Sequence, residues 1–296
     1  MLSNKQPKEI LQKSLEIETF KRVTFSFYRY IPIPEPVDFR NLLFGVFQKY
    51  HCLGRIYVAH EGINAQMNVP EPHLQELLAY FQTNPQLAKM PIKYALDNQQ
   101  SFLKLIVKVR PKIVADGLSD DAFDTSNVGK HLTALEFHEA MDAPGTFVVD
   151  MRNNYESEVG HFDGAICPDA ITFREELKML PEILEGQKQS KILLYCTGGV
   201  RCEKASAYLK DLGYEDVNQL HGGIIDYVRQ IKQLELTPRF IGKNFVFDNR
   251  MGERITNDVI AKCHQCGAIC DCSSTPFSAV IPATSNSIIL YAGRWQ

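Results

Sequence analysis

The segment KILLYCTGGVRCEKASAYLKDLGY, residues 191–214, constrains the fold more than any other part of the sequence. A mostly apolar run leads into Cys196, two glycines follow, and apolar residues then recur at helical spacing. A buried strand that passes directly into a helix is typical of a parallel sheet with helices on both faces. Two further apolar runs, TFVVD and VNQL, are predicted strands of the same sheet.

Cys196 stands at the carboxyl end of its predicted strand, where open α/β sheets bind their ligands. The helix that follows directs its free N–H groups and the positive end of its dipole at the sulfur. Gly198 and Gly199 allow backbone amides to turn toward an anion, and Arg201 adds a permanent cation. These features predict a low pKa for the Cys196 thiol, and a sulfur that acts as a nucleophile or carries a persulfide.

The loop between Cys196 and Arg201 contains four residues, Thr197, Gly198, Gly199 and Val200. Protein tyrosine phosphatases place a cysteine in a similar turn but have five residues before their arginine, so the shorter loop favours a single sulfur over a phosphate. Two roles stay open for Cys202, six residues after Cys196. It is either a resolving thiol that forms a disulfide with an oxidised Cys196, or a small residue at the helix start without chemical consequence.

The first third of the chain predicts a separate sheet. After a short amphipathic helix within residues 1–20, residues 21–115 predict a strand, a helix, two strands joined by a bend at 62–64, a helix and a strand. This βαββαβ order is the ferredoxin-like α+β pattern, in which helices cover one face of a sheet. A loose stretch rich in Asp, Ser and Gly, residues 116–135, is expected to be a linker to the second unit.

The last predicted strand of this first unit has a basic face. Strand alternation puts Lys104, Lys108 and Arg110 on one side, with Lys112 just past the strand end. Such a face is either a solvated sheet surface or a contact surface for the phosphate backbone of RNA. The whole chain has 32 basic and 35 acidic residues, a formal net charge of −3, so a surface for nucleic acid has to be local.

Cysteine usage and apolar patterning indicate the compartment. Eight cysteines in 296 residues are too few for a disulfide scaffold, and they predict thiols, metal ligands or redox groups. No apolar stretch approaches about 20 residues, and the N-terminus lacks the apolar region of a signal peptide. We therefore expect a cytoplasmic protein without a membrane segment. Four crowded cysteines near the C-terminus are candidate zinc ligands, or part of a disordered tail: Cys263, Cys266, Cys270 and Cys272.

The second unit resembles a rhodanese domain. Its loop is similar to the rhodanese persulfide loop Cys-x-x-Gly-x-Arg, matched by Cys196, Gly199 and Arg201. Upstream, DMRNNYESEVGHFDGAICP is similar to the rhodanese segment in which an Asp-x-Arg pair ends a strand, and downstream QLHGGIIDY resembles the rhodanese closing motif. We expect three residues of the upstream segment to brace the loop by ion pairing: Asp150, Arg152 and Glu156.

Together these features predict an α/β protein with three parts. A ferredoxin-like α+β domain is followed by a rhodanese-like domain with a doubly wound parallel sheet over residues 136–232, and then by a small cysteine-containing extension over residues 233–296. The arrangement resembles the rhodanese-domain tRNA uridine hydroxylases of bacteria over roughly residues 20–272. Its specific marks are HEGINA at 60–65, CTGGVRCEKAS at 196–206 and GKNFVFDNRMGERI at 242–255.

The resemblance implies an oxidoreductase that converts the wobble uridine of certain tRNAs to 5-hydroxyuridine, with molecular oxygen as co-substrate and tRNA as partner. It leaves the electron donor, the choice of tRNAs and the oligomeric state open, and the sequence contains no flavin or nicotinamide motif. Two other functions stay open. One is a sulfurtransferase that carries sulfur as a persulfide, and the other is a non-enzymatic RNA-binding protein whose cysteine loop senses redox state.

Overall fold

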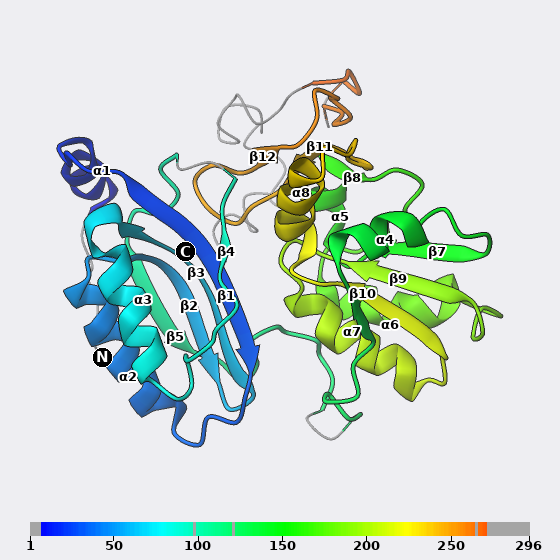
Figure 1. The fold of residues 1–296 in the computed structure, drawn as a ribbon, viewed down its shortest axis with the longest axis horizontal. Coiled ribbons are helices and arrows are strands. Elements are labelled where there is room, and N and C mark those ends of the chain that lie inside the picture. The colour runs from blue at the N-terminus through cyan, green and yellow to red at the C-terminus, as the bar shows by residue number, and fades with distance from the viewer. Residues whose placement is uncertain (1–6, 97–98, 120–121, 264–265, 271–296) are drawn as a thin grey trace.

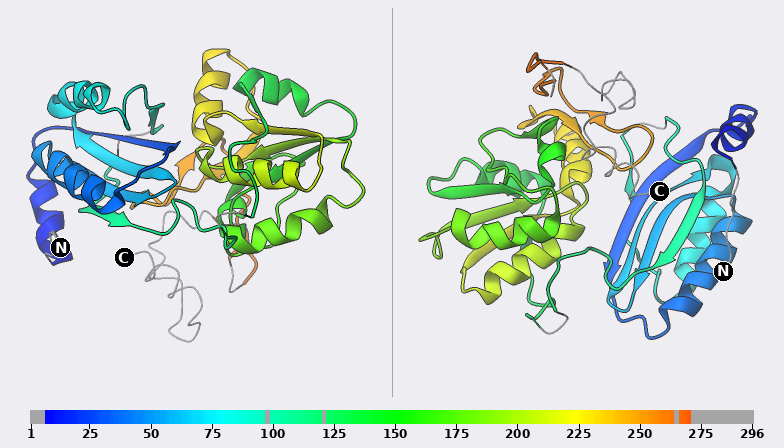
Figure 2. Two further views of the ribbon diagram at one scale, coloured as in Figure 1. Left: turned by 90° about the horizontal axis from the view of Figure 1, so that it is seen from below. Right: turned by 180° about the vertical axis from the view of Figure 1, so that it is seen from behind.

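The computed structural model shows two domains side by side, with a C-terminal segment that lies against both (Figure 1; Figure 2). No helix in the part of the chain that the structure describes combines the length and the apolar composition that a membrane span requires. The described residues are 7–96, 99–119, 122–263 and 266–270.

The N-terminal domain is built around one sheet. Its elements in chain order are α1 (Lys8–Glu16), β1 (Arg22–Tyr30), α2 (Pro36–Lys49), β2 (Leu53–Ala59), β3 (Gly62–Pro70), η1 (Glu71–His73), α3 (Leu74–Thr83), β4 (Lys93–Tyr94) and β5 (Leu105–Val109). The strand order is β4-β1-β3-β2-β5, and α2 and α3 lie on the face away from the second domain (Figure 1). β3 pairs antiparallel with β1 and β2, whereas β5 runs parallel to β2. This confirms the predicted ferredoxin-like α+β layout.

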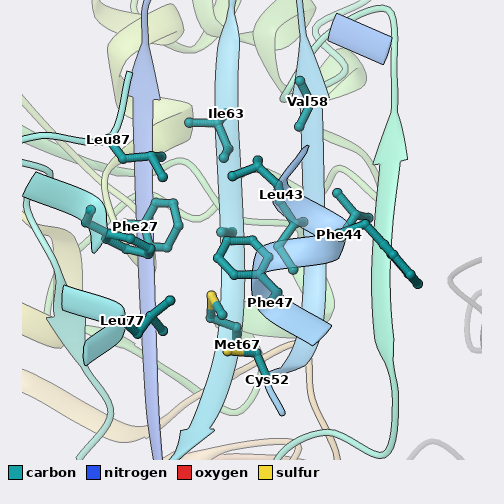
Figure 3. Close-up of a cluster of buried hydrophobic side chains, with 14 of the residues drawn as sticks. Phe27, Leu43, Phe44, Phe47, Cys52, Val58, Ile63, Met67, Leu77 and Leu87 are labelled. Carbon is teal, nitrogen blue, oxygen red and sulfur yellow. The ribbon is translucent and has the colours of Figure 1, made fainter. Parts of the chain in front are cut away.

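Alternation along β1 sorts its side chains between the two faces of this sheet. Phe25 and Phe27 are buried in the core between the sheet and its helices, and Figure 3 shows Phe27 there beside Leu77 and Leu87. Phe27 and Phe81 make an edge-to-face contact with ring centroids 5.3 Å apart. Tyr28 and Tyr30 project from the opposite face, which carries no helix and turns toward the second domain (Figure 1). The fold therefore presents aromatic hydroxyl groups to the second domain.

The predicted bend at residues 62–64 is wrong, because the chain reverses at residues 60–61. The two-residue turn His60–Glu61 joins β2 to β3, and Gly62 is already paired with Ala59. A Cβ atom at Gly62 would lie 2.1 Å from the carbonyl oxygen of Arg29. Glycine is needed here for the close approach of β3 to β1, and not for the chain reversal.

The strands after α3 also differ from the prediction. β5 begins at Leu105, so Lys104 of the predicted strand lies just before it, and the two-residue strand β4 pairs with β1 at the other edge of the sheet. Two residues cannot display a hydrophobic period, so the sequence pattern could not reveal β4. The order is therefore βαββαββ, and it places Lys93 beside Ser26 of β1.

The second domain has a parallel sheet between two layers of helices. Its elements are β6 (Lys130–Leu132), α4 (Ala134–Ala140), β7 (Thr146–Asp150), α5 (Asn154–Ser157), β8 (Gly160–Phe162), α6 (Phe173–Ile183), β9 (Lys191–Tyr195), α7 (Val200–Asp211), β10 (Asp216–Leu220) and α8 (Gly223–Gln233). The parallel strands are ordered β6-β10-β9-β7, with α6 and α7 packed on one face and α4 and α8 on the other. This confirms the predicted doubly wound sheet. β6 lies in the stretch that was expected to be a linker.

The C-terminal segment ties the two domains together. Its strands β11 (Phe240–Asn244) and β12 (Glu253–Arg254) form a small antiparallel sheet with β8 of the second domain. The same segment bonds the first domain, since Arg55 Nη1 donates to the carbonyl of Phe247 at 3.0 Å and the amide of Asn249 donates to the carbonyl of Ser101 at 2.8 Å. The extension is therefore part of the domain interface.

A buried ion network also joins the domains, and it gives the HEGINA segment a role. Lys204 on α7 pairs with Glu61 at 2.8 Å and with Asp116 at 2.5 Å. The other carboxylate oxygen of Glu61 accepts the amide of Ile113 at 2.7 Å, and Lys112 also pairs with Asp116. The side chains of Lys204 and Asp116 are each 1% exposed. Water therefore cannot solvate these charges, and each is stabilised by its oppositely charged partner.

We expect Lys204→Met to lower the free energy of unfolding by about 3 kcal/mol, because the substitution leaves Glu61 and Asp116 without their main cation. Urea unfolding followed by circular dichroism measures the change. Lys178→Met, at an exposed position on α6, is the matched control and should leave stability within about 0.5 kcal/mol. Equal stability of the two variants would contradict the role of this network.

Candidate active site

The loop after β9 wraps its own backbone around the sulfur of Cys196. The side chain of Cys196 has no exposed surface, and the amide of Gly199 donates a hydrogen bond to its Sγ at 3.1 Å. Gly199 precedes the first turn of α7 with a left-handed φ of 99°, which glycine adopts without strain. A Cβ atom there would lie 2.7 Å from the hydroxyl of Tyr28. Both the conformation and the space therefore require glycine.

Helix α8 holds the same loop from its other side. The amides of Ile224 and Ile225 donate to the carbonyls of Cys196 and Thr197, at 3.0 and 3.3 Å. Gly223 has a φ of 67°, and a Cβ atom there would lie 2.6 Å from the carbonyl oxygen of Cys196. The QLHGGIIDY segment therefore fixes the backbone of the loop, and it leaves the inward-facing amides for the sulfur.

The residues expected to brace the loop form two buried ion pairs. Arg201 makes a bidentate contact with Glu156, at 2.6 and 3.0 Å. Arg152 pairs with Asp150 at 2.6 Å, and the hydroxyl of Tyr195 donates to the same carboxylate at 2.7 Å. The first pair fixes the Arg201 side chain, and the second fixes the ends of β7 and β9 next to the loop.

The charge balance at Cys196 favours the thiolate. Burial by itself raises the pKa of this thiol, but the hydrogen bond from the Cys202 thiol, the charge of Arg201 and two backbone N–H bonds outweigh it and lower the pKa to about 5. The group is therefore a thiolate at neutral pH and is protonated only as the pH falls below about 5. A thiolate held by N–H donors in this way is a strong candidate nucleophile.

Cys202 is in direct contact with this sulfur. Burial raises the pKa of the Cys202 thiol well above its ordinary value, and its hydrogen bond to Cys196 and the Cys196 charge add to the effect. Cys202 is thus a protonated donor to the thiolate, a role that neither sequence alternative included. The contact also satisfies the proximity that a resolving thiol needs.

The N-terminal domain contributes residues that the sequence analysis missed. The Tyr28 hydroxyl donates to Glu203 on α7 at 2.9 Å, and the Tyr30 hydroxyl donates to the carbonyl of Val200 at 3.1 Å. His131 lies 3.0 Å from the same Glu203 carboxylate. Alternation along β1 indicates that the two tyrosines leave the core face, but no sequence signal links them to residues about 170 positions away.

A buried carboxyl group lies near the loop. Glu176 on α6 is fully buried, and among the described residues neither of its carboxylate oxygens has a hydrogen-bond partner. Burial raises its pKa well above the usual range, and the Arg201 charge opposes this shift.

The predicted RNA-binding residues divide into two groups. Lys104, Lys108 and Arg110 are exposed at the β5 edge, and the Arg110 guanidinium lies 5.5 Å from the ring centre of Tyr57. Lys112 does not extend this basic face, because it bonds Asp116 at 2.9 Å within the domain interface.

The predicted metal ligands lie partly outside the described residues. The structure describes Cys263, Cys266 and Cys270, whereas Cys272 is beyond its last described residue. Within the described ranges no three Cys, His, Asp or Glu side chains come close enough together to hold a metal ion.

A cysteine loop of the rhodanese type, covered by the helix-free face of a ferredoxin-like domain, defines a class of two-domain proteins with a buried loop cysteine. Three protein families match the chain in the same order. They are the UPF0176 acylphosphatase like domain over residues 22–113, the Rhodanese-like domain over residues 133–230 and the Rhodanase C-terminal over residues 241–277.

One solved structure resembles the second domain alone. It is a rhodanese-like domain protein of Staphylococcus aureus, 24% identical with a TM-score of 0.28, over 33% of this chain and 90% of that chain.

The similarity to curated relatives extends over most of the chain. The tRNA uridine(34) hydroxylase of Leptospira interrogans is 54% identical over 271 residues, which are 91% of this chain and 74% of that protein. The protein of the same name from Erwinia tasmaniensis is 49% identical over 92% of this chain and 78% of that protein. The chain therefore belongs to the tRNA uridine(34) hydroxylase family.

We expect Cys202→Ala to raise the pKa of Cys196, because it removes the thiol that donates to the thiolate. Cys202→Ser keeps a donor at this position and should leave the pKa of Cys196 near its value of about 5. The ultraviolet absorbance of the thiolate, followed against pH with Cys196→Ser as the blank, measures both values. If alanine and serine at position 202 give the wild-type titration, the thiol hydrogen bond has no effect on the sulfur.

Proposed function

We propose that this chain hydroxylates the wobble uridine, U34, of tRNA to 5-hydroxyuridine, with molecular oxygen as co-substrate. The observation that carries the proposal is the 54% identity over 91% of the chain to a tRNA uridine(34) hydroxylase. The Cys196 loop supports it, because a base modification at carbon needs a group that activates the ring. A tRNA substrate implies work in the bacterial cytoplasm.

In this proposal the Cys196 thiolate adds to C6 of the uracil ring. The S–C6 bond forms, and the C5=C6 electron pair moves onto C5 and the O4 oxygen, which makes C5 nucleophilic. Molecular oxygen supplies the oxygen atom that C5 receives, and an external two-electron donor reduces the second oxygen atom to water. Loss of the C5 proton and departure of the thiolate restore the double bond. Arg201 and the Gly199 amide stabilise the thiolate before addition and after release.

The basic edge at β5 is the proposed contact for the tRNA backbone. Lys104, Lys108 and Arg110 are exposed there, and Tyr57 adds an aromatic ring beside Arg110. Each phosphate that such a cation neutralises releases condensed counterions, so a local cluster binds RNA even on a protein with a net charge of −3.

We expect Cys196→Ser to abolish formation of 5-hydroxyuridine at position 34, because a serine hydroxyl is not ionised at neutral pH and does not add to the ring. The test expresses the chain in bacteria that lack their own hydroxylase and measures tRNA nucleosides by mass spectrometry. The wild-type chain should restore the modified nucleoside and the variant should not. Restoration by neither chain would refute the proposed function, and restoration by both would refute the role of Cys196.

We expect the triple variant Lys104→Ala, Lys108→Ala, Arg110→Ala to bind tRNA at least about tenfold more weakly and with a flatter salt dependence. Filter binding across a salt series measures both quantities. The matched control replaces three lysines of the second domain, Lys178, Lys188 and Lys191, and should bind like the wild type. Unchanged affinity and slope in the first variant would show that the β5 edge is only solvated.

A further inference from the structure

Lys93 on β4 is a buried lysine that reaches from the N-terminal domain over the Cys196 loop. Its residue surface is 4% exposed, and its Nζ lies 4.4 Å from the ring centre of Tyr28. Its Cδ lies 4.0 Å from the position that a Cβ atom would take at Gly198, inside the loop. Lys93 therefore lies where the N-terminal domain covers the Cys196 loop.

This ammonium group lacks the partner that buried lysines usually have. Among the described residues no carboxylate lies within 4.0 Å of Lys93 Nζ, and the Tyr28 ring is its one close electrostatic contact. Burial lowers the pKa of Lys93, and the charges of Asp226, Cys196 and Glu203 act against that shift from longer range. Within the described residues Lys93 therefore forms no salt bridge that would offset the cost of its burial.

The groups around Cys196 indicate which role the Lys93 ammonium group can have. The main groups that stabilise the thiolate are Cys202, Arg201 and the Gly199 amide, and Lys93 acts on it only from longer range. Lys93 instead approaches the loop at Gly198 from the side of the N-terminal domain, and its Nζ lies over the Tyr28 ring. A donor without acceptor capacity suits a carbonyl oxygen that gains negative charge.

We propose that Lys93 is a catalytic residue of this site: its Nζ donates a hydrogen bond to the O4 oxygen of the uracil over Cys196 and stabilises the charge that O4 gains on thiolate addition. The proposal rests on the proposed function. In this step the S–C6 bond forms, the C5=C6 pair shifts toward O4, and the proton stays on Lys93. The same donor disfavours cytosine, which presents an amino group in place of O4.

The test uses tRNA that carries 5-fluorouridine at position 34. The thiolate can still add to C6 when C5 carries fluorine, and this addition requires neither oxygen nor an electron donor. The rate at which the full-length protein forms a covalent adduct with this tRNA is followed by denaturing gel electrophoresis and mass spectrometry. Lys93→Met should form the adduct about 100-fold more slowly than the wild type. Lys93→Arg keeps a donor and should recover at least tenfold of that loss. Lys191→Met, at the far end of β9, is the matched control and should react like the wild type.

Thermal unfolding separates a catalytic role from a structural one. Lys93→Met removes a buried charge without an ion pair, so its melting temperature should equal or exceed that of the wild type while its adduct rate falls. A lower melting temperature with a parallel loss of adduct would show that Lys93 only packs on Tyr28. An unchanged adduct rate in Lys93→Met would also overturn the proposal.

The wild-type chain distinguishes this proposal from the function on which it rests. If the wild type hydroxylates U34 in cells but forms no adduct with the fluorinated tRNA, the thiolate addition and the role of Lys93 are both wrong and the function stands. If the wild type neither hydroxylates U34 nor forms the adduct, the proposed function fails and the role of Lys93 fails with it.

Discussion

A negative charge on a buried sulfur is the constraint on which the rest of the structure depends. Cys196 has no exposed surface, so protein groups take the place of solvating water. They are the Gly199 amide, the Cys202 thiol and an Arg201 side chain whose own charge is balanced by buried Glu156. The chain from β7 to α8 supplies all of these groups, and its turns, caps and ion pairs keep them in place.

The N-terminal domain closes this arrangement. Because α2 and α3 cover only one face of its sheet, the other face is available for contact, and the Tyr28 and Tyr30 hydroxyls bond α7 from there. The ion network around Lys204 and the C-terminal segment hold the two domains in this position. Both domains therefore form the site, although Cys196 itself lies in the second domain.

The sequence predicted those parts of the fold and the site that depend on residues close together in the chain. The strand, glycine turn and helix around Cys196 are consecutive, so pattern and chemistry together indicate a thiolate loop. Lys93 and Tyr28 could not be placed, because β4 is too short for a period and the Tyr28–Glu203 bond joins residues 175 positions apart. Lys112 was assigned to a basic face because strand alternation ignores the carboxylates that tertiary contact brings to it.

The contact between Gly199 and Tyr28 has a consequence for the exchange of domains between proteins. The left-handed φ of Gly199 already favours glycine, but the atom that excludes a larger residue is the hydroxyl of Tyr28, which belongs to the other domain. The glycine that the rhodanese loop needs for its own turn therefore also leaves the space that Tyr28 occupies. A rhodanese loop with this glycine can accept the tyrosine without a change of its own backbone. The limits on domain exchange lie instead in side-chain contacts such as that of Tyr28 with Glu203.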